Sequence, residues 1–136
     1  MTLPGPVEEL LIQTGDDVVR VRQLVRARAQ AEHLSLVDQT KLITAASELA
    51  RNALTYGGSG MMCVETVIRD GRHGVRATFT DDGPGIADLD RALTDGWTSG
   101  KGLGLGLGGA RRLVDEFDIQ TAVGRGTTVT VIKWAR

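Results

Sequence analysis

The stretch Ser99-Gly-Lys-Gly-Leu-Gly-Leu-Gly-Leu-Gly-Gly-Ala-Arg-Arg112 is the most informative part of this sequence, because glycines and leucines alternate along it. Its six glycines stand at positions 100, 102, 104, 106, 108 and 109. A glycine inside a helix costs roughly 0.5–1 kcal/mol relative to alanine, so a small domain should rarely keep several without a function. Residues 110–117, which follow, read as the body of a helix. A glycine-rich loop that enters a helix N-terminus offers free N–H donors and the positive end of the dipole, which predicts a phosphate-binding site.

Two simpler interpretations of this stretch are a flexible linker and a buried strand. The leucines at 103, 105 and 107 argue against a linker, because Gly/Ser linkers are not regularly apolar. The alternating glycines argue against a strand, because they would leave one of its faces without side chains. A phosphate-binding loop is therefore favoured.

Three familiar glycine motifs do not fit the stretch. A dinucleotide-binding fold needs a strand before its G-x-G-x-x-G loop and an acidic residue about 20 positions later. Here residues 95–101 are loop-like, and Val129 stands where the acid should be. A P-loop needs G-x-x-x-x-G-K-[ST], but Asp95 replaces its first glycine and Gly102 replaces its Ser/Thr. The V-A-I-K, H-R-D and D-F-G segments of eukaryotic-type kinases do not occur in the sequence.

The composition predicts one cytoplasmic domain without nucleic-acid or membrane partners. The chain has 136 residues, of which 41% are hydrophobic but only 4% aromatic, so one domain with an aliphatic core is expected. Its formal net charge of −1 gives no polyanion-binding signal. Cys63 is the single cysteine, which excludes an internal disulfide and a cysteine zinc cluster. No apolar run approaches the roughly 18 residues of a membrane span, and the N-terminus lacks the pattern of a signal peptide.

Hydrophobic periodicity and turn signals predict an α+β two-layer sandwich. Ser35 followed by Asp38 resembles a capping box at the start of a helix, and Asp70-Gly71 predicts the turn of a hairpin. Because helices and strands come in runs rather than in strict alternation, the α+β class is favoured. Strands are expected at 7–13, 61–69, 75–80, 117–123 and 127–134, and helices at 16–32, 35–56, 88–94 and 110–117.

Two further segments have residue types that can carry chemistry. Glu48 and Asn52 are four residues apart in the second predicted helix, so they share one face. A carboxylate can deprotonate a nucleophile and an amide oxygen can bind Mg²⁺, although such pairs also occur on ordinary solvated helix faces. The segment Asp81-Asp-Gly-Pro-Gly85 follows a strand-like run and is either an ordinary turn or part of a ligand site.

Taken together and in this order, the segments resemble the Bergerat-fold ATPases, the superfamily of gyrase, Hsp90, histidine kinases and MutL. Its helical box E-x-x-x-N is matched by Glu48 and Asn52, and its D-x-G-x-G box begins at Asp81. Its G-x-G-x-G loop is matched by Gly102, Gly104 and Gly106, and its late G-T by Gly126-Thr127. The resemblance covers roughly residues 7–134.

The resemblance implies a single histidine-kinase-like ATPase domain over residues 1–136, with a mixed sheet packed against helices, that uses ATP and Mg²⁺. Glu48 would be the general base, Asp81 would accept a hydrogen bond from the adenine amino group, and Asn52 would bind Mg²⁺. The other positions that it implies for nucleotide binding are Gly83, Gly85, Lys101, Gly102, Leu103, Gly104, Leu105, Gly106 and Thr127.

Within this superfamily, several local strings resemble the RsbT-type switch serine/threonine kinases of the stressosome. They are Ala46-Ser-Glu-Leu-Ala-Arg-Asn52, Asp95-Gly96 before an aromatic residue, Arg112-Leu-Val-Asp-Glu-Phe117 and Ile132-Lys-Trp134. The resemblance implies phosphorylation of STAS-domain scaffold or antagonist proteins, and binding and activation of a PP2C-type phosphatase. Lys101 and Gly108 depart from the expected small residues, which affects the choice of partner more than the nucleotide chemistry.

Other functions compatible with the residues stay open at this stage. The nearest alternative is an anti-sigma factor of the same fold that sequesters a sigma factor and phosphorylates its antagonist. A nucleotide-gated binding module without catalysis is disfavoured by Glu48, because a binder needs no base, and an autonomous ATPase is disfavoured by the short lid. Trp97, in the predicted lid over 89–104, is expected either at a partner surface or folded back onto the core.

Overall fold

The computed structural model of the chain describes residues 6–93 and 106–136. The elements follow the predicted order of strands and helices along the chain. They are β1 (Glu8–Ile12), α1 (Gly15–Ala31), α2 (Leu36–Gly57), β2 (Gly60–Arg69), β3 (Arg72–Asp81), α3 (Leu89–Ala92), α4 (Gly106–Leu113), β4 (Glu116–Thr121) and β5 (Thr127–Trp134). No described helix combines the length and the hydropathy that a membrane crossing requires.

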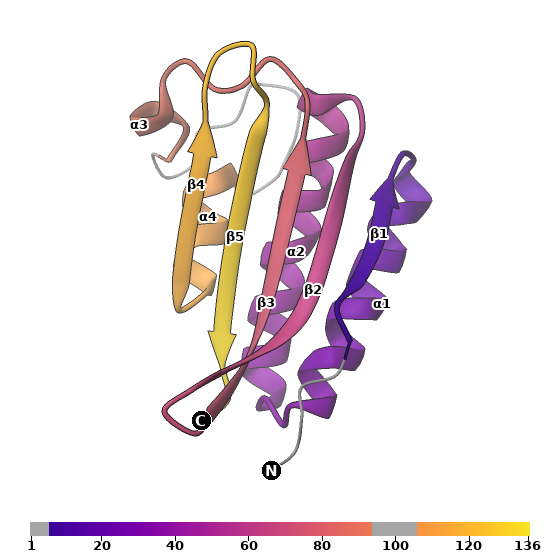
Figure 1. Cartoon of the computed structure of the whole chain (residues 1–136), viewed down its shortest axis with the longest axis vertical. Helices are drawn as coiled ribbons and strands as arrows, with labels where there is room; N and C mark the ends of the chain where they lie inside the picture. The colour runs from indigo at the N-terminus through magenta and orange to yellow at the C-terminus, as the bar shows by residue number, and fades with distance from the viewer. Residues whose placement is uncertain (1–5, 94–105) are drawn as a thin grey trace.

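The strands form one sheet with the order β1-β2-β3-β5-β4 (Figure 1). Every neighbouring pair in the described sheet is antiparallel, so the expected mixed sheet is not found there. The reason is the position of β5. Strands β3 and β4 run in the same direction, but β5 lies between them and runs in the opposite direction.

The predicted hairpin joins β2 to β3 through a two-residue turn. Arg69 and Arg72 are register partners, and Asp70 and Gly71 between them have φ angles of 53° and 78°. Two consecutive positive φ angles match the right-handed twist of the flanking strands, which is why Asp-Gly is favoured in such turns. Strand β3 begins at Arg72, three residues earlier than expected, because the tight turn lets pairing start at once.

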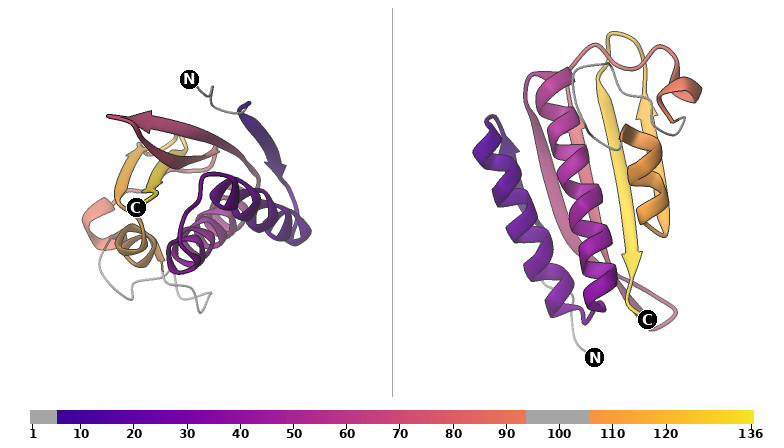
Figure 2. Two further views of the ribbon diagram at one scale, coloured as in Figure 1. Left: turned by 90° about the horizontal axis from the view of Figure 1, so that it is seen from below. Right: turned by 180° about the vertical axis from the view of Figure 1, so that it is seen from behind.

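Helices α1, α2 and α4 pack on one face of the sheet, and no helix of the described residues covers the other face (Figures 1 and 2). The α+β two-layer sandwich is thus confirmed. Alternate residues of the strands point to the helices, so the core is formed by aliphatic side chains from both layers. Its fully buried members include Val21 and Val25 of α1, Leu42 and Leu49 of α2, Met62 and Val64 of β2, Val75 of β3 and Val131 of β5.

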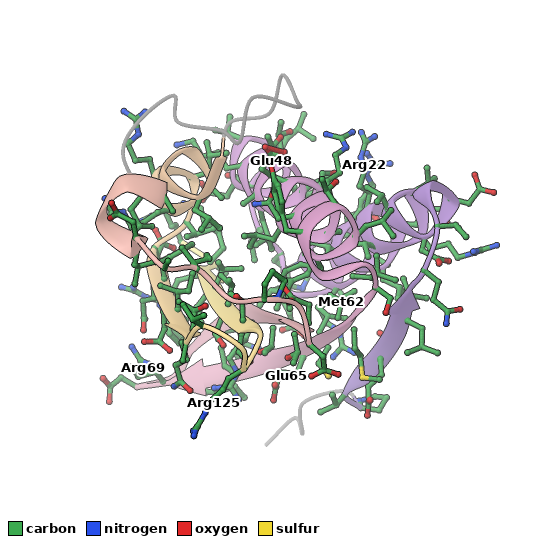
Figure 3. All side chains as sticks on the ribbon, turned by 90° about the horizontal axis from the view of Figure 1, so that it is seen from above. Arg22, Glu48, Met62, Glu65, Arg69 and Arg125 are labelled. Carbon is green, nitrogen blue, oxygen red and sulfur yellow. The ribbon has the colours of Figure 1, made fainter. Side chains whose placement is uncertain are left out.

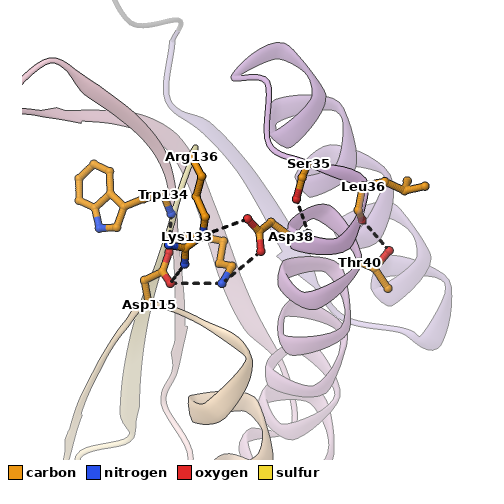
Figure 4. Close-up of polar contacts among 8 residues, drawn as sticks. All are labelled: Ser35, Leu36, Asp38, Thr40, Asp115, Lys133, Trp134 and Arg136. Carbon is orange, nitrogen blue, oxygen red and sulfur yellow. Dashed lines mark hydrogen bonds and ion pairs between the residues drawn. The ribbon is translucent and has the colours of Figure 1, made fainter.

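The longest helix, α2, is fixed at its N-terminus by a cap and an ion cluster. The Ser35 hydroxyl accepts a hydrogen bond from the Asp38 N–H at 3.1 Å, which confirms this half of the predicted cap. The buried Lys133 ammonium of β5 lies 3.5 Å from the Asp38 carboxylate and 3.2 Å from that of Asp115 (Figure 4). Arg136 pairs with both carboxylates. The cluster therefore ties the first turn of α2 to β5 and to the link between α4 and β4.

Helix α4 begins at Gly106 and ends at Leu113, whereas the sequence predicted a helix over 110–117. Leu107, Gly108, Gly109 and Ala110 are buried in it, and α4 packs against α2. Glycines without Cβ atoms allow two helices to approach closely, and this packing offsets their poor helix propensity. Residues 116 and 117 belong to β4 instead.

Candidate functional site

Glu48 and Asn52 lie four residues apart on α2, so they share one face of that helix. The Glu48 side chain is buried, with 6% of its surface exposed, whereas Asn52 is half-buried. Figure 3 shows Glu48 on the side of the helix layer that faces away from the sheet. Its Oε1 accepts a hydrogen bond from the Gly106 N–H at 3.0 Å, so the carboxylate is joined to the first residue of α4.

Asp81 is the last residue of β3, at the same end of the molecule as the C-terminus of α2 (Figure 1). Its Oδ1 accepts a hydrogen bond from the Gly83 N–H at 2.8 Å, which closes the turn after the strand. Burial raises the pKa of this carboxyl group, the Gly83 N–H opposes that rise, and the negative charge of Asp82 adds to it. The side chain is therefore an acceptor held in a partly dehydrated place.

Glycines surround Asp81 because nothing larger fits beside it. A Cβ atom on Gly57, at the end of α2, would lie 2.5 Å from the Asp81 Cβ. A Cβ on Gly126 would lie 2.1 Å from the Asp81 carbonyl oxygen, and Gly126 has a positive φ of 78°. A Cβ on Gly83 would lie 2.7 Å from the Gly57 Cα. The sequence predicted the end of the second helix at residue 56 and no role for Gly57 in the site. The glycines that follow it in Gly57-Gly-Ser-Gly60 were the signal that could have pointed to one.

Thr127 opens β5 directly opposite Asp81, and Thr121 ends β4 directly opposite Thr127. Cross-strand partners share one face of a sheet, so the three side chains lie in one row on the helix-covered face. The two threonine hydroxyl oxygens are 2.9 Å apart. Thr121 was not predicted as a site residue, because a lone threonine near a strand end carries no signal in the sequence.

The turn between β4 and β5 is also bound to the segment after Asp81. The Gly124 N–H donates to the Pro84 carbonyl oxygen at 2.8 Å, and the Ile86 N–H donates to the Thr121 hydroxyl at 2.9 Å. Gly85 has a φ of 76°, and a Cβ there would lie 2.1 Å from the Ala122 carbonyl oxygen. The Gly83–Gly85 segment is thereby held against the end of the sheet.

The structure brings the predicted residues together at one end of the fold, in two groups. One group contains Asp81, Gly83, Gly85 and Thr127 at the ends of β3 and β5, and the other contains Glu48, Asn52 and Gly106 where α2 meets α4. Five predicted nucleotide contacts and the lid tryptophan lie outside the described residues: Lys101, Gly102, Leu103, Gly104, Leu105 and Trp97.

The donor set fits a magnesium ion bound mainly by phosphate and water. Mg²⁺ in nucleotide sites takes one or two protein oxygen atoms, and the Asn52 amide oxygen is of that kind. The described residues contain no group of three or more His, Cys, Asp or Glu side chains suited to a metal.

Residues 37–135 match the family of histidine kinase-, DNA gyrase B- and HSP90-like ATPases, and the chain belongs to this family. It is 42% identical over 125 residues to the serine/threonine-protein kinase RsbT of Bacillus subtilis (strain 168). That match covers 92% of the chain and 94% of the kinase. The predicted enzyme class, an ATP-dependent serine/threonine kinase similar to RsbT, is confirmed by this similarity.

The anti-sigma F factor of Geobacillus sp. (strain WCH70) is a second relative, 32% identical over 102 residues, with 70% of the chain and 68% of that protein covered. A solved structure of the RsbU and RsbW domains of a Mycobacterium tuberculosis protein matches with a TM-score of 0.66 and 25% identity. The match covers 97% of the chain, which spans 33% of that structure. The mycobacterial sensor histidine kinase MprB has the same fold, with a TM-score of 0.56. Together, RsbT and the anti-sigma F factor support a partner-switching kinase.

Proposed function

We propose that this protein transfers the γ-phosphoryl group of ATP to serine or threonine residues of STAS-domain regulatory proteins. In this role it is a partner-switching regulator of the bacterial stress response, and residues 1–136 act as one ATPase domain. The observation that carries the proposal is the Glu48–Gly106 hydrogen bond, because it joins a buried carboxylate to the helix that follows the glycine-rich loop. The similarity to RsbT over most of both chains supports it.

The adenine base binds at the ends of β3 and β5. Asp81 accepts a hydrogen bond from the exocyclic amino group, and Thr127 contributes its hydroxyl from the opposite strand. Gly83 and Gly85 let the backbone pass beside the base, because their lack of Cβ atoms already permits close contacts there. A carboxylate acceptor in a partly buried place favours an amino group over a carbonyl oxygen.

The phosphates bind where the glycine-rich loop enters α4. The first N–H groups of a helix have no partner inside the helix, and the dipole adds positive potential at that end. The resemblance implies phosphate contacts for Lys101, Gly102, Leu103, Gly104, Leu105 and Gly106, and Asn52 would offer its amide oxygen to a magnesium ion that accompanies the phosphates. When bound, Mg²⁺ neutralises charge that develops on the phosphates during transfer.

Glu48 removes the proton from the attacking hydroxyl. Its Oε1 is held by the Gly106 N–H, which orients the carboxylate relative to the loop and leaves Oε2 to take the proton. The acceptor hydroxyl comes from the partner protein. Phosphoryl transfer depends mainly on positioning and on charge stabilisation, so the base and the N-terminus of α4 share the task.

Once the kinase is released from the STAS protein, it binds a PP2C-type phosphatase and activates it.

A second candidate function is an anti-sigma factor kinase that sequesters a sigma factor. It is favoured by the 32% identity with an anti-sigma F factor, over a smaller share of the chain than the match to RsbT. A pull-down with sigma factors distinguishes the two candidate functions, because only an anti-sigma factor kinase would retain a sigma factor.

The proposal is tested by incubating the purified chain with labelled ATP, Mg²⁺ and a STAS-domain protein from the same genome. Label on a serine or threonine of the STAS protein is expected, and labelling should be about 10²–10⁴-fold slower when Glu48→Gln replaces the wild type. A second arm measures the phosphatase activity of a PP2C-type protein with and without the kinase. Binding of ATP without label on any STAS protein would overturn the proposed transfer.

A further inference from the structure

We propose that Thr121 is a positioning residue that fixes the Thr127 hydroxyl opposite Asp81 and thereby sharpens the preference for adenine. The inference rests on the proposed function, because Thr127 is there a contact of the nucleotide base. Thr121 itself need not touch the nucleotide. It acts from β4, the edge strand next to β5 (Figure 1).

The Thr121 hydroxyl makes three hydrogen bonds. It accepts from the Ile86 N–H at 2.9 Å, it donates to the Gly126 carbonyl oxygen at 3.1 Å, and it lies 2.9 Å from the Thr127 hydroxyl. A hydroxyl group has one donor and two acceptor positions, so three partners use its full capacity. A group saturated in this way has one preferred orientation, which it imposes on its neighbours.

The three partners belong to separate segments around the proposed base site. Ile86 follows the Gly83–Gly85 segment, Gly126 ends the turn between β4 and β5, and Thr127 begins β5. Gly126 lies against the backbone of Asp81, because a Cβ on it would come within 2.1 Å of the Asp81 carbonyl oxygen. Thr121 thus connects the segment that follows Asp81 with the start of β5, which lies opposite Asp81.

The consequence for specificity follows from the freedom of a hydroxyl group. An unrestrained Thr127 hydroxyl could turn to donate to a carbonyl oxygen or to accept from an amino group at little cost. Its hydrogen bond with Thr121 restricts that turn, so adaptation to the wrong base would break an existing hydrogen bond. The pocket is therefore preorganised for one base rather than adaptable to several.

The experiment compares Thr121→Val with Thr121→Ser and with Thr128→Val. Valine keeps the shape of threonine without the hydroxyl, whereas serine keeps the hydroxyl. Thr128 is adjacent to Thr127 but points to the sheet face opposite α1, α2 and α4, so its replacement is a matched control. Affinities for ATP and for inosine triphosphate, which has a carbonyl oxygen in place of the 6-amino group, are measured by calorimetry.

We expect Thr121→Val to lower the ratio of ATP affinity to inosine triphosphate affinity by about three- to tenfold, the range that one hydrogen bond supplies. Thr121→Ser and Thr128→Val should keep the wild-type ratio. A purely structural role would weaken both nucleotides equally, so an unchanged ratio in Thr121→Val overturns the inference. If Thr121→Val does not fold, Thr121→Ala, which demands less space, is measured against the same expectation.

A double variant tests whether Thr121 acts through Thr127. In a Thr127→Val background, adding Thr121→Val should change the affinity ratio by less than twofold, because the hydroxyl it positions is already gone. If the affinity ratio falls as much as it does in the wild-type background, Thr121 does not act through Thr127. The two claims fail on different results. If the wild type binds no ATP, the proposed function is wrong. If the wild type prefers ATP but Thr121→Val keeps the same affinity ratio, only the inference about Thr121 is wrong.

Discussion

The Glu48 carboxylate accepts a hydrogen bond from the backbone N–H of Gly106 at 3.0 Å, and the two residues are 58 positions apart in the chain. The bond gives Glu48 a structural task beside its proposed role as a base. It holds the first residue of α4, whose N-terminus follows the glycine-rich loop. The two tasks need different atoms of the side chain and can be separated by substitution.

The first prediction separates these tasks. Glu48→Gln keeps a carbonyl oxygen that can accept from Gly106, so ATP binding should stay near normal while transfer slows about 10²–10⁴-fold, the usual loss for a general base. Glu48→Ala removes the acceptor as well and should also weaken ATP binding. Single-turnover transfer and calorimetry measure the two effects. Normal transfer in Glu48→Gln would exclude Glu48 as the base.

The second prediction concerns the choice of base. Asp81→Asn should weaken ATP binding by about 1–3 kcal/mol, because the amide is a poorer acceptor and can present its NH₂ group to the adenine amine. The same change should reduce the preference for ATP over GTP. Asp82→Asn, at the exposed neighbouring position, is the control and should alter neither affinity. Equal affinities of the wild type for ATP and GTP would contradict this assignment of Asp81.

The third prediction follows from the raised pKa of Asp81, which burial causes and the Asp82 charge reinforces. A folded-state pKa above the unfolded value means that the folded protein holds the proton more tightly, so the ionised carboxylate costs stability above that pKa. Without nucleotide at neutral pH, Asp81→Asn should therefore unfold at a higher temperature than the wild type. The advantage should shrink as the pH falls through the raised pKa of Asp81. Thermal melts across pH measure both, and a less stable variant at neutral pH would refute the argument.

The fourth prediction concerns the ion cluster at the opposite end of the fold (Figure 4). Lys133 has only 4% of its surface exposed, so Lys133→Met should lower the free energy of unfolding by about 3 kcal/mol, near the lower end for breaking a buried pair. Arg136 still neutralises Asp38 and Asp115 in that variant, which limits the loss. Arg136→Ala, at a largely exposed side chain, should cost about 0–1 kcal/mol. Urea denaturation measures the free energy of unfolding of both variants. Equal losses of that free energy in the two variants would contradict the argument from burial.

Several features could be predicted because they depend on residues close together in the chain. The Asp70-Gly71 turn places its two positive φ angles where a tight hairpin needs them, and Ser35 caps α2 within three residues. The spacing of Glu48 and Asn52 follows from the period of one helix. The family boxes at Asp81 and Gly126-Thr127 are likewise short local patterns, so their positions at strand ends followed from the sequence.

Other features depend on contacts between distant segments, and no local pattern encodes them. Helix α4 begins at Gly106, not at residue 110, because packing against α2 outweighs the poor helix propensity of its glycines. The sheet is antiparallel because β5 lies between β3 and β4. Gly57 and Thr121 enter the site only through the approach of α2 to Asp81 and through the pairing of β4 with β5. The sequence alone thus determined the order of the elements and the candidate residues within its short motifs, since propensity and spacing act over a few residues. Strand order and the neighbours of Asp81 and Thr127 were decided by tertiary packing, which acts between residues far apart in the chain.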